Sequence, residues 1–375
     1  MAGSDSIGDA MRAAVASGVF PGAVLFVRLQ GQVVHHRSYG HAALLPRPLP
    51  ASPETIYDLA SLTKPLATTT AILSLIGARR LSLDDPIGAR LNELRSAPIG
   101  RATVAQLLNH SSGLPAWRPL YERVAEQDRM TPGFLGSPRA QGLVLQAIAE
   151  EAPLSESGAR TLYSDLGFML LGFLVERVAG CPAPAYCREQ VYRPLQAEPL
   201  FYFGPNRQPA WGAVSPDRVA PTEQDPWRGR LLRGEVHDEN AFALGGIAGH
   251  SGLFGTAAAV GAVAASWLDA YHGRTSPLPA DLVRRFVRRD ERTAESSWAL
   301  GWDTPSAPSS SGTKFSPRAF GHLGFTGTSI WIDPEQELEV VLLSNRVHPS
   351  RRNDAIRRFR PVILDLIYEE CVGRR

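Results

Sequence analysis

The feature that most constrains this chain is a serine and a lysine three residues apart, Ser61 and Lys64, where one kind of local structure gives way to another. Residues 55–57 are β-branched or aromatic and predict a strand, whereas residues 66–76 form a long apolar run that predicts a helix. In a helix, residues three apart lie on one face, so an ammonium group would lie beside a hydroxyl near unpaired N–H groups. A serine that only caps a helix gives the same pattern, so the rest of the chain must decide between catalysis and capping.

Composition excludes several classes of protein. The chain has 375 residues, of which 44% are hydrophobic and 20% are charged, as in ordinary globular proteins with a large core. Lys and Arg total 39 against 37 for Asp and Glu, so the net charge of +2 gives no reason to expect a nucleic-acid partner. Arginines cluster within residues 284–292 and 351–360, where apolar residues recur at helical spacing. We predict that these arginines lie on solvent-facing sides of helices.

The cysteines and the hydrophobic pattern indicate a cytoplasmic protein. Three cysteines at no metal-binding spacing, Cys181, Cys187 and Cys371, favour reduced thiols over a disulfide framework. Residues 1–9 lack the basic and apolar regions of a signal peptide. We expect no membrane partner, because the most apolar segment, residues 241–267, contains several glycines and is better interpreted as a buried helix.

Three segments that resemble functional sites are interpreted as structural. His237-Asp238-Glu239-Asn240 has the composition of a metal site, but no second set of ligands follows at useful spacing, so we expect no metal and no cofactor. His110 and Ser111 are adjacent, and adjacent side chains on a helix diverge. Residues 249–252 lack the closing glycine of a G-x-S-x-G nucleophile elbow.

Strand patterns occur near both ends of the chain, and helices dominate its middle. Residues 23–27 and 32–36 flank a turn at Gln30-Gly31 and predict a hairpin. Residues 319–332 and 338–344 predict further antiparallel strands. Residues 119–156 are predicted to be irregular, with Ser137-Pro138 as a turn marker. The arrangement predicts an α+β fold.

Two further polar patterns follow Ser61 in the chain. Tyr163-Ser164-Asp165 precedes a strongly apolar helical run, and His322-Leu323-Gly324 lies in a predicted strand. Together with Ser61-x-x-Lys64, their order resembles the serine β-lactamase-related superfamily. The chain is most similar to the branch of class C β-lactamases, DD-peptidases and family VIII esterases, whose motifs are S-x-x-K, Y-x-N and K-T-G or H-x-G. The resemblance runs from about residue 22 to residue 346.

This resemblance implies one β-lactamase-related domain over residues 1–375. A sheet lobe would comprise about residues 1–60 and 290–375, and a mostly helical lobe about residues 61–290, with the active-site cleft between them. Ser61 would be the nucleophile, and the backbone N–H groups of Ser61 and Phe325 would hold the oxyanion. Asp165, His322 and Gly324 would lie at the substrate.

The chemistry of the motif predicts how the serine is activated. Free lysine titrates near pH ~10.4 and tyrosine near ~10, so neither is normally a base at neutral pH. Burial lowers the pKa of a lysine, and a neighbouring ammonium lowers the pKa of a tyrosine. Lys64 and Tyr163 are therefore expected to share one proton, acting first as general base on Ser61 and then as general acid.

Two departures from the family pattern bear on the substrate. His322-Leu323-Gly324 replaces Lys-Thr-Gly, which removes a cation and a hydroxyl, so we expect weak recognition of a substrate carboxylate. Asp165 replaces the usual asparagine and would pair either with Lys64 or with an amine on the substrate. Pairing with Lys64 would raise the pKa of that lysine and leave more of the base role to Tyr163.

Three functional hypotheses follow. The first is a serine hydrolase that cleaves carboxylic esters or small amides through a Ser61 acyl-enzyme. The second is a D-alanyl-D-alanine carboxypeptidase or a β-lactamase, and the third is a catalytically silent binding protein on the same scaffold. Retention of Ser61, Lys64 and Tyr163 together argues against the third. The expected partner is a small ester, amide or peptide, and no oligomeric state is predicted.

Overall fold

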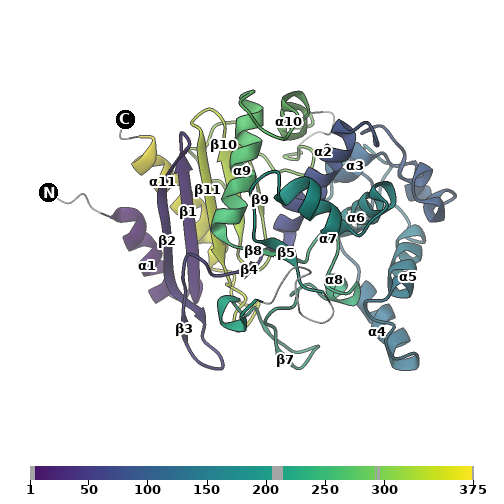
Figure 1. Cartoon of the computed structure of the whole chain (residues 1–375), viewed down its shortest axis with the longest axis horizontal. Coiled ribbons are helices and arrows are strands. Elements are labelled where there is room, and N and C mark those ends of the chain that lie inside the picture. The colour runs from purple at the N-terminus through teal and green to yellow at the C-terminus, as the bar shows by residue number, and fades with distance from the viewer. Residues whose placement is uncertain (1–4, 205–213, 292, 294–295, 374–375) are drawn as a thin grey trace.

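Strands from both ends of the chain form one antiparallel sheet, in the order β3-β2-β1-β11-β10-β9 (Figure 1). The computed structural model describes residues 5–204, 214–291, 293 and 296–373. The strands are β1 (Gly22–Leu29), β2 (Gln32–Ala43), β3 (Leu49–Pro50), β9 (Phe320–Leu323), β10 (Ser329–Asp333) and β11 (Leu338–Ser344). Strand β1 pairs with β2 across the predicted hairpin and with β11 on its other side, where Ala23 lies opposite Ser344. The chain ends are thus joined at the centre of the sheet.

Alternation along β1 gives the sheet two buried faces. Ala23, Leu25 and Val27 pack on one face against α1 (Ser6–Ala16) and α11 (Ile356–Cys371), whereas Val24 and Phe26 belong to the larger core on the other face. Helix α9 (Ala257–Tyr271) covers that other face (Figure 1). Helix α9 belongs to residues 61–290, which were expected to form a separate helical lobe, yet it packs on the sheet.

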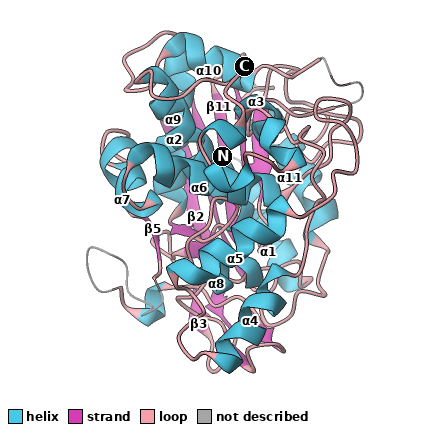
Figure 2. Cartoon of the chain, turned by 90° about the vertical axis from the view of Figure 1, so that its right-hand side faces the viewer, coloured by secondary structure: helices cyan, strands magenta, loops and turns pink. Residues whose placement is uncertain are grey.

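The rest of the chain forms short helices and two small sheets, and Figure 2, which looks onto this side, shows the long loops that join them. The helices are α2 (Thr70–Gly77), α3 (Val104–Leu108), α4 (Leu120–Met130), α5 (Pro138–Ala149), α6 (Asp165–Ala179), α7 (Ala183–Cys187), α8 (Glu239–Ala243) and α10 (Ala280–Val287). One small sheet has the order β4 (Tyr57–Asp58), β8 (Leu253–Gly255) and β5 (Leu200–Tyr202), and the other pairs β6 (Gln224–Asp225) with β7 (Arg230–Leu231). Part of the arginine cluster at residues 284–292 lies outside the described residues.

The prediction of irregular structure over residues 119–156 was wrong. Helices α4 and α5 occupy much of this segment. The Ser137 hydroxyl accepts a hydrogen bond from the Ala140 amide, and Pro138 is the first residue of α5. Serine followed by proline begins a helix as readily as a turn, because proline has no N–H to leave unpaired in the first helical turn.

Among the described residues, no single helix is long and apolar enough to cross a membrane. Two consecutive helical segments, Asp165–Ala179 and Ala183–Tyr192, together have the length and apolar composition of a membrane span, but they are bent by 74° relative to each other.

Two helical glycines test how tightly the helical side is packed. A Cβ atom at Gly172 in α6 would lie 2.8 Å from the Gly249 nitrogen, whereas a Cβ at Gly142 in α5 would meet nothing within 4 Å. We expect Gly172→Ala to lower the free energy of unfolding by about 1–3 kcal/mol through overpacking. Gly142→Ala is the matched control and should raise it by about 0.5–1 kcal/mol, since alanine favours the helix. Urea denaturation measures both, and equal effects of the two substitutions would contradict this packing.

Candidate active site

Ser61 lies in a single 3-10 turn, Ala60–Leu62, directly after strand β4. The turn begins at Ala60, whose φ of 48° lies in the left-handed region that alanine rarely adopts. The buried Asp58 carboxylate accepts hydrogen bonds from the Ala60 amide at 2.9 Å and the His237 amide at 2.7 Å. These bonds hold an unfavourable backbone conformation, so the position of Ser61 is fixed by the protein around it.

Lys64 is fully buried and its ammonium group contacts Ser61. Its Nζ lies 3.0 Å from Ser61 Oγ and donates to Asp165 Oδ1 at 2.6 Å and to the His250 carbonyl at 3.2 Å. The predicted approach of the two side chains is observed, but the long α-helix expected after them is not. Residues Lys64–Thr69 form a π-helix, and the α-helix begins only at Thr70. Pro65, which has no N–H for helical bonding, lies in this first turn.

Asp165 pairs with Lys64 in this structure. It lies in the first turn of α6, where the Ser164 hydroxyl accepts from the Gly167 amide and a negative charge is favoured by the helix dipole. Burial alone would lower the pKa of Lys64, but the charges and hydrogen bonds of Asp165 and Tyr163 outweigh it and raise that pKa above its ordinary value. Lys64 is therefore held as a cation.

Tyr163 lies against the same ammonium group. Its ring centroid is 4.8 Å from Lys64 Nζ, and hydrogen bonding with Lys64 and Ser61 favours the phenolate. Burial has the larger effect and, together with the charge of Asp165, raises the pKa of Tyr163 above its ordinary value. Tyr163 and Lys64 thus both hold a proton in the resting protein.

Three aromatic rings surround the ring of Tyr163 and restrict its orientation. Its ring centroid lies 4.6 Å from that of His110, 5.4 Å from Trp298 and 6.1 Å from His322. His110 is buried and its Nδ1 accepts from the Ser164 amide at 3.1 Å, in keeping with the structural role predicted for it. Burial, then the charges of Lys64 and His322, lower the pKa of His110 well below its usual range, so this ring is neutral.

His322 does not reach the substrate surface, which corrects the position expected from the motif. It is 2% exposed, and its Nδ1 donates to the Leu323 carbonyl at 2.8 Å. Burial and the charge of Lys64 lower the pKa of His322 to about 3. Strand β9 turns the next residues toward the cleft instead, so that Leu323, Gly324 and Phe325 line it.

Gly324 allows this strand to approach the nucleophile turn. A Cβ at Gly324 would lie 2.0 Å from Thr328 Oγ1 and 2.6 Å from the Leu59 carbonyl oxygen. The hydroxyl of Thr328 donates to that same carbonyl at 3.0 Å. The backbone N–H groups of Ser61 and Phe325 donate no hydrogen bond to any other described residue. Both residues line the same cleft, so these two N–H groups are candidates for the oxyanion donors.

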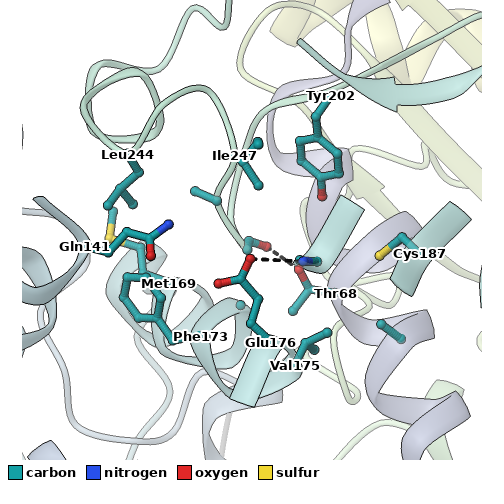
Figure 3. A pocket seen from close by; sticks show the side chains of 15 residues that line it. Thr68, Gln141, Met169, Phe173, Val175, Glu176, Cys187, Tyr202, Leu244 and Ile247 are labelled. Carbon is teal, nitrogen blue, oxygen red and sulfur yellow. Dashed lines mark hydrogen bonds between the residues drawn. The ribbon is translucent and has the colours of Figure 1, made fainter. Parts of the chain in front are cut away.

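These groups line a cleft of about 810 Å³, which is large enough for a small substrate. Ser61, Tyr163, Asp165, Gly324 and Phe325 are among its lining residues. A second cavity, lined by Thr68, Met169 and Tyr202 among others (Figure 3), has a volume of only about 20 Å³ and holds little more than one water molecule. The larger cleft is therefore the candidate active site, because it contains Ser61 and Tyr163.

Within the described ranges, no group of three or more His, Cys, Asp or Glu side chains could hold a metal ion. The acidic segment that resembled a metal site is used for hydrogen bonding. His237 Nε2 lies 2.9 Å from Glu223 Oε2, and Asp238 Oδ1 accepts from the Ala241 amide and lies 2.9 Å from His250 Nε2.

The cleft also contains residues that the sequence did not assign to it. Trp117, Arg346, Arg351, Arg357 and Arg360 are among its lining residues. The prediction of solvent-facing arginines was wrong for Arg360, which is 6% exposed. The signal was present in the sequence, because Arg360 follows Ile356 by four residues and precedes Ile363 by three, which places it on the apolar side of α11.

A family model described as Beta-lactamase matches residues 7–362. The chain belongs to the beta-lactamase family. It is 31% identical over 357 residues to a putative D-alanyl-D-alanine carboxypeptidase of Escherichia coli (strain K12), which covers 88% of this chain and 79% of that protein. It is 30% identical over 353 residues to an N-acetylmuramyl-L-alanine amidase of Bacillus subtilis (strain 168), covering 88% and 78%.

Two solved structures share this fold. EstCE1, a hydrolase with promiscuous acyltransferase activity, matches with a TM-score of 0.71 at 21% identity, covering 95% of this chain and 97% of that one. The octameric penicillin-binding protein homologue from Pyrococcus abyssi matches with a TM-score of 0.73 at 22% identity, covering 98% and 77%. The fold class, the family and the serine hydrolase class expected from the motifs are confirmed.

The ion pair of Asp165 predicts a shift in pH dependence. Asp165→Asn removes a negative charge beside Lys64 and Tyr163, so the pair should lose the first of its two protons more easily. We expect the acidic limb of the pH profile of kcat/KM to move about 1–3 pH units lower. Glu239→Gln, which removes a carboxylate from the same cleft without touching Lys64, should leave that limb in place. A limb that stays fixed in Asp165→Asn would show that this ion pair does not control the base.

Proposed function

We propose that this beta-lactamase family protein hydrolyses carboxylic esters or small amides through an acyl-enzyme on Ser61. The observation that supports the proposal is the 3.0 Å approach of Lys64 Nζ to Ser61 Oγ, with Tyr163 against the same ammonium group at the wall of an open cleft. A serine hydroxyl needs a neighbouring base before it can attack a carbonyl carbon.

Tyr163 is the better candidate for that base. Asp165 holds Lys64 as a cation, and the ammonium group stabilises a phenolate on Tyr163 once the pair has lost one proton. Tyr163 then takes the proton of Ser61 as Oγ bonds to the substrate carbonyl carbon. The backbone N–H groups of Ser61 and Phe325 would stabilise the oxyanion that forms.

Further proton transfers through Tyr163 complete the cycle. Tyr163 returns it to the leaving alcohol or amine as the scissile bond breaks, which leaves an ester on Ser61. Tyr163 next takes a proton from a water molecule that attacks this ester, and Ser61 recovers its proton as the acid departs. No external oxidant, reductant or metal is consumed in this scheme.

Hydrolysis of p-nitrophenyl butyrate tests the nucleophile. We expect turnover by the wild-type protein and a loss of at least about 10³-fold in kcat for Ser61→Ala. Ser74→Ala is the matched control, because Ser74 lies on helix α2 and hydrogen-bonds Tyr186 rather than lining the cleft. Equal activity of wild type and Ser61→Ala would refute the assignment. Absence of both turnover and labelling of Ser61 by a fluorophosphonate would favour a silent binding protein.

The relatives by sequence favour a second candidate, cleavage of peptides. The match in Escherichia coli is named a putative D-alanyl-D-alanine carboxypeptidase, and other matches in Salmonella carry the same name. If this chain has that activity, we expect release of D-alanine from a peptide ending in D-alanyl-D-alanine and covalent labelling of Ser61 by benzylpenicillin. Intact-protein mass spectrometry measures the adduct, and Ser61→Ala should prevent it. If the protein hydrolyses esters but neither forms the benzylpenicillin adduct nor releases D-alanine, the carboxypeptidase function is excluded. The cytoplasmic location expected from the sequence stays a prediction.

A further inference from the structure

One histidine in the cleft has no role in the proton transfers through Tyr163. His237 lines the same cleft as Ser61, although the residue as a whole is only 4% exposed. Its Nε2 lies 2.9 Å from Glu223 Oε2, whereas its Nδ1 forms no hydrogen bond with any described residue. A ring nitrogen at the cleft wall that no neighbouring residue uses is available to a molecule bound in the cleft.

Glu223 determines which nitrogen of the ring carries a hydrogen atom. Burial alone would raise the pKa of Glu223, but hydrogen bonds with His237 and Arg351 outweigh it and lower that pKa to about 2. Glu223 is therefore a carboxylate, which only accepts hydrogen bonds, so the donor is Nε2 of His237. Because Arg351 already balances the charge of Glu223 at 2.5 Å, the neutral ring satisfies this contact. In that tautomer Nδ1 carries a lone pair and is an acceptor.

The backbone and ring of His237 are both held beside the nucleophile turn. The His237 amide donates to Asp58 Oδ2 at 2.7 Å, and the other oxygen of this carboxylate accepts from the Ala60 amide at 2.9 Å. His237 is thus tied to the residue that precedes Ser61. Its ring centroid lies 5.6 Å from that of Phe325, with an interplanar angle of 28°. The imidazole therefore adjoins both segments that carry the candidate oxyanion donors.

The charged side chains around these two rings balance one another, which favours a neutral donor at the free nitrogen. Arg351 binds Glu223 at 2.5 Å and Glu239 at 2.8 Å, and the guanidinium of Arg346 lies 4.5 Å from the centre of the Phe325 ring. Two cations and two carboxylates leave no excess negative charge to attract an ammonium group. An amide N–H donates without a net charge, and a flat amide packs well against the Phe325 side chain, which is 48% exposed.

We propose that His237 is a specificity-determining residue whose Nδ1 accepts a hydrogen bond from an amide N–H group of the substrate. The substrates favoured by this contact are esters or amides that carry a second amide group close to the scissile bond, as acylated amino acids do. Glu223 acts through His237, because it holds the tautomer in which Nδ1 is the acceptor. The inference rests on the proposed function only in taking Ser61 as the point where the substrate is cleaved.

Two pairs of esters test this hydrogen bond, and within each pair an N–H group is replaced by a methylene group. The first pair, p-nitrophenyl N-acetylglycinate and p-nitrophenyl 4-oxopentanoate, varies the acyl part. The second pair, 3-acetamidophenyl butyrate and 3-(2-oxopropyl)phenyl butyrate, varies the leaving group. Each kcat/KM is divided by the rate constant for hydroxide-catalysed hydrolysis of the same ester, which removes differences in intrinsic reactivity. We expect the corrected ratio to favour the N–H ester by about fivefold or more in at least one pair.

Two substitutions of His237 separate its acceptor from the rest of the ring. His237→Asn places an oxygen near the position of Nδ1 and should keep most of the preference, whereas His237→Gln places its amide near the position of Nε2 and should lose it. His41→Gln is the matched control and should keep the wild-type ratio, because His41 is exposed on β2 outside the cleft lining. No preference in either pair, or an unchanged preference in His237→Gln, would overturn the proposal. In that case hydrolysis of these esters by Ser61 would leave the proposed function standing.

A measurement without turnover keeps the inference independent of the proposed function. Histidine ¹⁵N NMR of the Ser61→Ala protein at neutral pH reports the tautomer of each ring, and His237→Gln in the same background identifies the signals of His237. We expect a hydrogen on Nε2 alone, and a shift of the Nδ1 signal that an N–H ester causes and its methylene partner does not. If no ester is hydrolysed, the proposed function fails while this shift still supports the hydrogen bond. A hydrogen on Nδ1, or equal shifts with both members of each pair, would overturn it.

Discussion

The site depends on one ammonium group that is kept charged in the interior. Lys64 is completely buried, and a buried cation is costly unless it is paired and hydrogen-bonded. Asp165, Ser61 and the His250 carbonyl supply three acceptors. Each comes from a different part of the chain, so the burial of one side chain brings together the strand β4 turn, the start of α6 and the segment before β8.

Burial, reinforced by the charge of Lys64, determines the protonation state of two neighbouring histidines. His110 and His322 are buried within reach of its field, and both have their pKa values lowered, so neither adds a second buried cation. These neutral rings lie beside the Tyr163 ring, which also contacts the ammonium group. The histidine of the His-x-Gly motif thus packs near Tyr163, and the glycine allows the close approach of the residues after β9 to Leu59.

Most residues of the candidate site could be predicted from the sequence, but fewer details of the fold around it could be. Ser61, Lys64, Tyr163 and Asp165 could be found because each belongs to a short pattern whose order along the chain is itself informative. The π-helix at Lys64 could not be found, because an apolar run predicts burial equally for both helix types. The position of His322 depends on which face of β9 meets the cleft. Strand β9 is the edge strand of the sheet, and its orientation is set by tertiary packing rather than by the local sequence. Arg360 lies on the apolar side of α11, where a charged residue is uncommon, so its charge predicts exposure and its spacing predicts burial.

The two departures from the family motifs are physically connected. An asparagine at position 165 would leave the Lys64 charge available to the cleft, and a lysine at position 322 would add another cation near the same ammonium group. In this chain Asp165 neutralises Lys64 locally, and position 322 holds a neutral ring. The two departures therefore act in the same direction, because each lowers the positive charge beside Ser61.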